Sequence, residues 1–160
     1  MKSQKMRSKK QSAANSIAEK RLKKAVFYLD ESIYSRSLLE RMREAGANVE
    51  HARGAIPAGS EDEDWLSECG KRGWIVLTRD QRIRHRRLEL NAIQAYGVAA
   101  FCLIVGQGTA DEVADIIEPM IQKMVNISVS ESKPCLYTFG RSRRLNKVKL
   151  RGAIDNNQEL

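Results

Sequence analysis

The sequence predicts an α/β fold, a three-layer α/β/α sandwich with a mostly parallel sheet. The first observation is size, because 160 residues with 42% hydrophobic content suit a single domain with one packed core. The second is a set of short, continuous apolar runs, which are typical of strands buried on both faces of a parallel sheet. The third is that these runs alternate with longer amphipathic segments, as in βαβ units.

The first strand and helix are predicted directly after a basic N-terminal segment. Residues 25–29 form an apolar run that ends at Asp30, as expected for a buried strand. Ser32 can cap the following helix, and Gly46 can end it. The apolar face of that helix consists of Ile33, Leu38, Leu39 and Met42. Residues 47–51 then form a short second strand.

The second half of the chain repeats this pattern. A loop over residues 52–59 leads to an acidic run at residues 60–64, a composition that favours the start of a helix. The remaining elements, in the order strand, helix, strand, helix and edge strand, are residues 74–77, 81–96, 98–105, 109–126 and 135–139. In folds of this class, ligand sites lie at the carboxyl ends of the strands.

The positive charge of the chain is concentrated at its two ends. Residues 1–24 have a net charge of +8, residues 25–140 of −4 and residues 141–160 of +4. We therefore divide the chain into a flexible basic arm with some helix near residues 16–24, a folded domain over residues 25–140, and an unanchored basic tail over residues 141–160. Basic ends beside an acidic body suit the binding of a polyanion, although they can also simply aid solubility.

Composition disfavours several classes of protein. No apolar run approaches the about 18 to 20 residues of a membrane span, and no secretion signal follows the first charges. We therefore expect a soluble, cytoplasmic protein without a membrane partner. The three cysteines are widely spaced and the two histidines, His51 and His85, are far apart in the sequence. This spacing disfavours a zinc site, a redox cysteine pair and a Ser/His catalytic site. Any metal ion must be held by oxygen ligands.

Three aspartates are predicted to meet at one edge of the sheet. Asp30 ends the first strand and Asp80 follows the third, and parallel strands end at the same edge. Asp62 begins the helix after the second strand, and such a helix also starts there. Glu31 can join them as an auxiliary acid. Each acid also has a purely structural interpretation, as a helix cap for Asp62, Asp64 and Asp80 or as a strand end.

Carboxylates gathered at neutral pH repel one another unless a cation neutralises them. Mg²⁺ and Mn²⁺ suit this role because they prefer oxygen ligands and retain waters that can become nucleophiles. With a polyanion held nearby by the basic ends, the predicted reaction is metal-assisted hydrolysis of phosphodiester bonds.

Three short motifs follow one another in the chain: Tyr28-Leu29-Asp30-Glu31, Asp62-x-x-Trp65-Leu66 and Val76-Leu77-Thr78-Arg79-Asp80. On these motifs, residues 26–139 resemble the PIN-like ribonucleases, in particular the compact group that includes the VapC-type toxins of toxin–antitoxin modules. The resemblance implies a Mg²⁺- or Mn²⁺-dependent endoribonuclease whose catalytic, metal-binding acids are Asp30, Asp62 and Asp80, with Thr78 supporting the site. It also implies a cognate antitoxin protein that blocks the site.

The longer PIN domains have an additional acid on an early helix. The candidate here, Glu40, is about nine residues into its predicted helix, or roughly 13 Å from the strand end. We therefore favour Glu31 as the additional metal ligand, and we regard Asp64 as a supporting acid. The basic N-terminal arm is not part of the family core.

Residues 79–87 are the densest positive patch of the predicted folded domain. They contain five arginines, whose guanidinium groups suit phosphate oxygens. Arg82 and Arg86 are four residues apart and are predicted to share one helical face. From there, together with Arg79, they would hold the RNA while Asp80 holds metal. A solvated arginine-rich face is the alternative interpretation.

Two other functions stay open. A phosphoacceptor receiver domain also has acids at strand ends, but residues 101–108 lack the lysine that such a domain needs after its last core strand. A catalytically silent PIN-like scaffold would bind RNA or a protein partner without cleaving. The sequence leaves open the RNA target, the identity of an antitoxin and the oligomeric state, including a homodimer.

Overall fold

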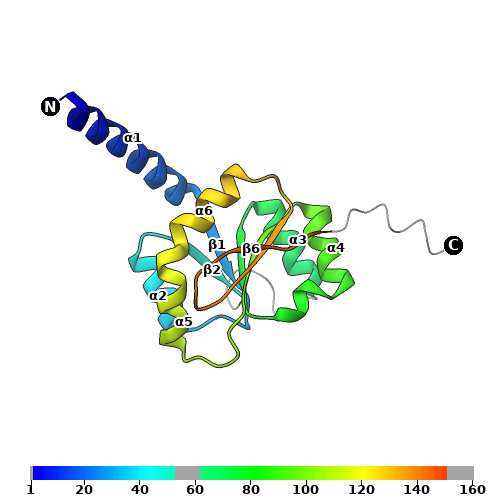
Figure 1. Ribbon diagram of the computed structural model, residues 1–160. Coiled ribbons are helices and arrows are strands. Elements are labelled where there is room, and N and C mark those ends of the chain that lie inside the picture. Colours follow the sequence, from blue (N-terminus) through cyan, green and yellow to red (C-terminus); the bar gives the residue numbers. More distant parts are fainter. Residues whose placement is uncertain (1, 53–61, 151–160) are drawn as a thin grey trace.

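A six-stranded sheet forms the centre of the computed structural model, which describes residues 2–52 and 62–150, with side chains described over residues 9–52 and 64–150 (Figure 1). Its strands are β1 (Val26–Leu29), β2 (Asn48–His51), β3 (Ile75–Thr78), β4 (Ala99–Leu103), β5 (Cys135–Phe139) and β6 (Asn146–Lys147). The strand order is β2-β1-β3-β4-β5-β6, with parallel pairing up to β5 and an antiparallel β6. The predicted mostly parallel sheet is confirmed.

Helices cover both faces of the sheet and complete three layers. One face carries α2 (Arg36–Glu44), α5 (Ala110–Ile117) and α6 (Ile121–Ser130), and the other carries α3 (Asp62–Arg72) and α4 (Arg87–Tyr96) (Figure 1). A first apolar cluster fills the space between the sheet and α2, α5 and α6, and a second fills the space between the sheet and α3 and α4. Because side chains alternate along a strand, Phe27 and Leu29 of β1 face the first cluster and Tyr28 faces the second. Burial on both faces explains why these strands are continuous apolar runs.

One glycine allows α3 and α4 to pack closely, and a second ends α4. A Cβ atom at Gly70 would lie 2.5 Å from the carbonyl oxygen of Tyr96, so only glycine fits at this contact. Gly97 ends α4 in the left-handed conformation, with a φ of 63°, which glycine adopts at little cost. Gly70 therefore sets how closely α3 approaches the end of α4, and Gly97 lets the chain leave α4 toward β4.

Helix α2 begins later than the sequence predicts. Its N-terminal cap is Ser35, whose Oγ accepts a hydrogen bond from Leu38 N at 3.0 Å. The helix proper therefore starts at Arg36. The expected cap, Ser32, instead donates its hydroxyl to Asp30. The prediction for Ser32 is thus wrong, because the acid at the strand end is the nearer partner.

The helix predicted over residues 81–96 is two elements. A short 3-10 turn, η1 (Gln81–Arg84), is capped by the side chain of Asp80. The backbone is then extended at Arg86, with φ −77° and ψ 118°, before α4 begins. The helix predicted over residues 109–126 is likewise divided into α5 and α6, which are joined by the 3-10 turn η2 (Glu118–Met120).

The N-terminal segment is one long helix, α1 (Lys2–Lys24), although the sequence indicates helix only near residues 16–24. It projects from the domain, and its last turns meet the domain near α6 (Figure 1). Leu22 packs against the first apolar cluster, and Gln122 Nε2 donates to the Ala18 carbonyl at 3.3 Å. In the parts of the chain that the structure describes, no helix combines the length and the apolar composition of a membrane span.

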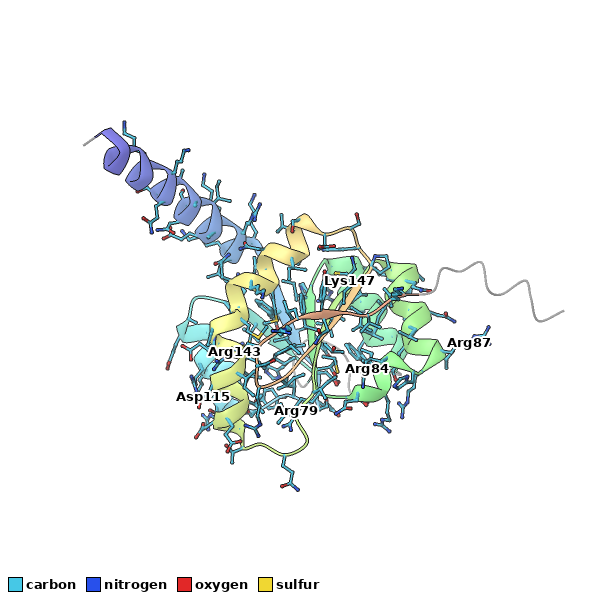
Figure 2. The ribbon with its side chains drawn as sticks, in the orientation of Figure 1. Arg79, Arg84, Arg87, Asp115, Arg143 and Lys147 are labelled. Carbon is cyan, nitrogen blue, oxygen red and sulfur yellow. The ribbon has the colours of Figure 1, made fainter. Side chains whose placement is uncertain are left out.

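The C-terminal segment is bound to the domain as far as residue 150, which corrects the prediction of an unanchored tail from residue 141. β6 pairs with β5, so β5 is not the edge strand. Val148 and Leu150 pack against the second apolar cluster. Arg143 Nη2 donates to the Asp115 carbonyl at 3.0 Å, and the two residues lie side by side in Figure 2. The part of the tail over residues 151–160 lies outside the described residues.

Candidate active site

The carboxyl edge of the sheet brings two of the predicted acids together. β1 and β3 are neighbours with Leu29 paired to Leu77, and the Asp30 N–H donates to the Leu77 carbonyl at 3.1 Å. Asp80 follows β3 by two residues. Asp30 and Asp80 therefore leave the sheet at the same edge, as the parallel topology predicts.

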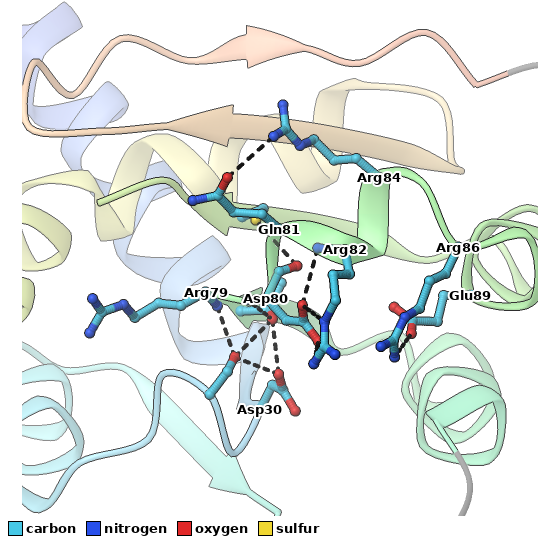
Figure 3. A network of polar contacts seen from close by, with 11 residues as sticks. Asp30, Arg79, Asp80, Gln81, Arg82, Arg84, Arg86 and Glu89 are labelled. Atoms are coloured by element: carbon cyan, nitrogen blue, oxygen red, sulfur yellow. Dashed lines mark hydrogen bonds and ion pairs between the residues drawn. The ribbon is translucent and has the colours of Figure 1, made fainter. Parts of the chain in front are cut away.

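Two hydroxyl groups hold the Asp30 carboxylate. Thr78 Oγ1 donates to Asp30 Oδ2 at 2.9 Å, and Ser32 Oγ donates to the same oxygen at 2.6 Å (Figure 3). Thr78 is only 1% exposed, so its hydroxyl must find partners inside the protein. It also accepts a hydrogen bond from Asp80 N at 3.0 Å. Thr78 is thus the link between the two acids.

The two carboxylate oxygens of Asp30 differ in their hydrogen bonding. Within the described residues, hydrogen bonds reach Oδ2 but not Oδ1. Protein hydroxyls therefore orient one oxygen, and no described residue occupies the other. This arrangement suits a carboxylate that must present a lone pair in a fixed direction to a hard cation.

Asp80 is engaged on both of its carboxylate oxygens by one arginine. Arg82 Nε lies 2.9 Å from Oδ1, and Arg82 Nη2 lies 3.1 Å from Oδ2. The Arg82 backbone N–H also donates to Oδ1, at 3.1 Å. Hydrogen bonds from the Arg82 side chain are the main reason that the pKa of Asp80 is lowered, and partial burial opposes them. Asp80 is therefore ionised at neutral pH and already carries a counterion.

The helix that carries Asp62 starts beside this edge. α3 begins at Asp62, and Trp65, one turn later, stacks on Tyr28 of β1 with ring centroids 5.5 Å apart. α3 runs away from the edge while β1 runs toward it. Asp62 is thus about 4.5 Å beyond Trp65 along the helix, and Asp30 is about 6.6 Å beyond Tyr28 along the strand. The backbone of Asp62 therefore lies near the level of Asp30, whereas the Asp62 side chain lies outside the described residues.

The two remaining predicted acids, Glu31 and Asp64, are both exposed. Glu31 directly follows Asp30, and Asp64 is in the first turn of α3. Among the side chains that the structure describes, no three acids, histidines or cysteines gather closely enough to hold a metal ion. Of the predicted metal ligands, Asp30 and Asp80 are the two that the structure links through Thr78.

The later start of α2 changes the argument about Glu40. Glu40 is four residues after Arg36, which places it about 6 Å along the helix and not nine residues into it. Its carboxylate pairs with Arg36 Nε at 3.2 Å on the exposed surface. The distance from the strand end is therefore no longer a reason to prefer Glu31 over Glu40.

Thiol chemistry does not contribute at this edge. Cys102 of β4 is fully buried, and its Sγ lies 3.7 Å from the Asp80 carbonyl oxygen. Burial raises the pKa of Cys102 to about 11, and it raises the pKa of Cys69 to about 12. Both thiols are protonated at neutral pH, so they are not nucleophiles.

The comparison with protein families places a large part of the folded domain in a known family. A family model described as a PIN like domain matches residues 25–104, from the residue before β1 to the residue after β4, which is half of the chain. This chain belongs to the PIN-like domain family. Neither the comparison with curated proteins nor the comparison with solved structures finds a match. The matched region contains Asp30, Thr78 and Asp80, and the narrower toxin group stays a prediction.

The PIN-like domain uses its arginines at this edge partly for internal contacts. Arg86 Nη1 lies 3.2 Å from Oε1 of the buried Glu89. Arg79 Nη2 donates to the Val105 carbonyl at 3.4 Å, and its side chain points away from Asp30 (Figure 3). The prediction that Arg82 and Arg86 share the face of one helix is wrong, because η1 ends at Arg84 and Arg86 precedes α4 with an extended backbone.

Sequence reasoning missed two features of this PIN-like site. The first is Ser32, which holds Asp30 and also accepts a hydrogen bond from Arg79 N at 3.0 Å. A serine two residues after an acid at a strand end is a usable signal, because short polar side chains bond locally in turns. The second is the pairing of Arg82 with Asp80. Residues two apart do not face each other on a helix, so the sequence spacing gave no indication of this contact.

Proposed function

We propose that this PIN-like domain is a Mg²⁺- or Mn²⁺-dependent endoribonuclease that hydrolyses RNA phosphodiester bonds at the carboxyl edge of its sheet. The observation that carries the proposal is the state of Asp30. Thr78 and Ser32 fix one of its oxygens, and the other is left for a ligand near Asp80. Membership of the PIN-like family supports a nuclease over a phosphoacceptor receiver domain.

The residues at this edge fit a hard divalent cation. Such ions prefer carboxylate oxygens; Asp30 offers one directly, and Asp80 offers another once Arg82 gives way. Asp62 and Glu31 complete the proposed set. When bound, the cation supplies a polarised water as nucleophile and offsets negative charge on the scissile phosphate.

The protein's own cations have a separate role in this proposal. A guanidinium that leaves Asp80 is already beside the site, where it suits a phosphate oxygen. We therefore assign Arg82 to RNA contact, together with Arg79 and Arg86 on either side of it in the sequence. Ser32 and Thr78 keep the Asp30 carboxylate oriented, and Asp64 supports the start of α3.

Cleavage of a mixed single-stranded RNA pool by the purified protein tests the proposal. We expect cleavage with Mn²⁺ or Mg²⁺, and loss of cleavage both in EDTA and in the Asp30→Asn variant. Asp115→Asn is the matched control, because it makes the same change on α5, where Asp115 pairs with Arg41. Metal-dependent cleavage by Asp30→Asn at the wild-type rate would remove Asp30 from the site.

The competing function is a catalytically silent PIN-like protein that binds RNA or a protein partner. One observation favours it, namely that Arg82 already occupies both carboxylate oxygens of Asp80. A folded protein that binds the RNA pool but leaves it intact with either cation would support this function and contradict the nuclease.

We further propose that the protein is the toxin of a toxin–antitoxin module, with a cognate antitoxin as its partner. The support is the resemblance of its three motifs to the VapC-type group. Induced expression in cells is expected to arrest growth, and Asp30→Asn is expected to abolish the arrest. An active nuclease that leaves growth unchanged would contradict the toxin assignment without affecting the nuclease assignment.

A further inference from the structure

A groove of about 360 Å³ lies at the opposite, amino edge of the sheet. Its lining includes Ala25, which directly precedes β1, Gly73, two residues before β3, and Lys133, two residues before β5. The other lining residues include the last turns of α1 and the end of α6. The groove is therefore separated from Asp30 and Asp80 by the length of the strands.

Every charged residue that lines this groove is basic: Lys20, Arg21, Lys24 and Lys133. Arg21 donates to Asn126 Oδ1 at 3.4 Å. The three lysines are exposed, and in the described residues none of them forms an ion pair. Cations that gather without counterions repel one another, so an anionic ligand would relieve the repulsion.

The groove also exposes apolar surface. Ile17 of α1 is 53% exposed and Val129 of α6 is 55% exposed, and both line the groove. These are two of the four large hydrophobic side chains that are exposed in the described part of the chain. A ligand that joins anionic groups to flat apolar faces would cover both kinds of surface.

Helix α1 extends this positive surface away from the domain. It carries nine lysine or arginine residues and one glutamate, and at 23 residues it is about 34 Å long. A second copy of this chain would bring the same positive charge and is not a suitable occupant. An acidic peptide would match the groove alone, whereas a polyanion with regularly spaced charges would match the groove and the helix together.

We propose that α1 and this groove form a second RNA-binding surface, which holds the phosphate backbone of single-stranded RNA through Lys20, Lys24 and Lys133. The choice of RNA rests on the proposed function. Ile17 and Val129 contact the apolar faces of the bases, which every nucleotide presents, so this surface binds without regard to sequence. RNA is thus held at the amino edge of the sheet and cut at the carboxyl edge.

Binding of the full chain to a labelled single-stranded RNA of about 20 nucleotides, in EDTA to prevent cleavage, tests this surface. Lys20→Glu/Lys133→Glu is expected to weaken binding by roughly tenfold or more at low salt, and to lower the slope of log K against log salt by about 1.4. The matched control is Arg36→Glu/Arg43→Glu, which makes the same charge change on the outside of α2. Equal weakening by both double variants would overturn the proposal.

Amide chemical shifts locate the contact directly. Titration of the same RNA in EDTA is expected to shift Gly73, Ser128, Val129 and Lys133, all of which line the groove. Shifts confined to the carboxyl edge would overturn the proposal. A parallel titration with poly-glutamate tests for an acidic protein partner instead: groove shifts with poly-glutamate but not with RNA would also overturn it. Groove shifts in a protein that never cleaves RNA would contradict the proposed nuclease and support this binding surface. Cleavage of RNA without groove shifts would contradict the binding surface and support the nuclease.

Discussion

The two edges of the same sheet treat their charged side chains in different ways. At the carboxyl edge, Asp30 is fixed by the buried Thr78 and Asp80 is paired with its own arginine. At the amino edge, Lys20 and Lys133 are exposed and have no ion-pair partner among the described residues. Fixed groups suit chemistry, which depends on geometry, and free cations suit affinity for a polyanion. In the two proposals above, the carboxyl edge is therefore the place where RNA is cut, and the amino edge is a place where it is held.

The largest effect that would sharpen this comparison is expected from Asp80→Asn. It removes a charge from the carboxyl edge and should lower the cleavage rate on the order of a hundredfold to a thousandfold. RNA affinity in EDTA should be retained, because the cations at the amino edge are untouched. Cleavage rate and affinity measured on the same folded preparation check this. Parallel losses of both would show that the two edges do not act separately.

A second test asks whether the carboxyl edge is the more rigidly built of the two. Thr78→Val removes a buried hydroxyl that donates to Asp30 and accepts from Asp80 N, so the free energy of unfolding should fall by about 1–3 kcal/mol. Thr78→Ser keeps the hydroxyl and should recover most of this loss. Lys133→Glu at the amino edge should change stability by less than about 0.5 kcal/mol. Urea denaturation of the three variants measures the difference.

The free part of α1 can be separated from the groove. Deleting residues 2–16 removes five basic residues and leaves the groove-lining residues from Ile17 onward in place. RNA binding should weaken, and the slope of log K against log salt should fall by up to about 3.5. The cleavage rate at saturating RNA should not change. An unaltered salt slope would confine RNA binding to the groove and to the carboxyl edge.

The smallest expected effect concerns the Asp80–Arg82 pair and pH. The fold holds the pKa of Asp80 below its unfolded value of about 3.9. The pair therefore stabilises the protein at neutral pH, and this contribution is lost as the pH falls below about 4 through the folded pKa. Because the arginine is largely exposed, Arg82→Gln should cost at most about 1 kcal/mol at pH 7, and less than that near pH 3. If Arg82→Gln lowers the free energy of unfolding equally at both pH values, the loss comes from packing of the arginine and not from its ion pair with Asp80.

Much of the architecture could be predicted because it depends on local pattern. Strands buried on both faces must be continuous apolar runs, so the run ending at Asp30 and the run ending at Thr78 were readable. Parallel topology then required Asp30 and Asp80 to share an edge. The breaks in the predicted helices were not readable in the same way. The cap at Ser35 and the extended backbone at Arg86 depend on which neighbours each segment meets in the folded chain.

The sequence by itself determined the three-layer α/β class, the edge at which the acids emerge and the concentration of positive charge near the ends. These follow from hydrophobic periodicity and from the counting of charges, which need no knowledge of distant contacts. Only the tertiary structure decided that Thr78 and Ser32 hold Asp30, that β6 adds an antiparallel edge strand beside β5, and that Lys133 joins the end of α1 in one groove. Each of these contacts joins side chains from separate elements, and no local pattern specifies which distant residues will become neighbours.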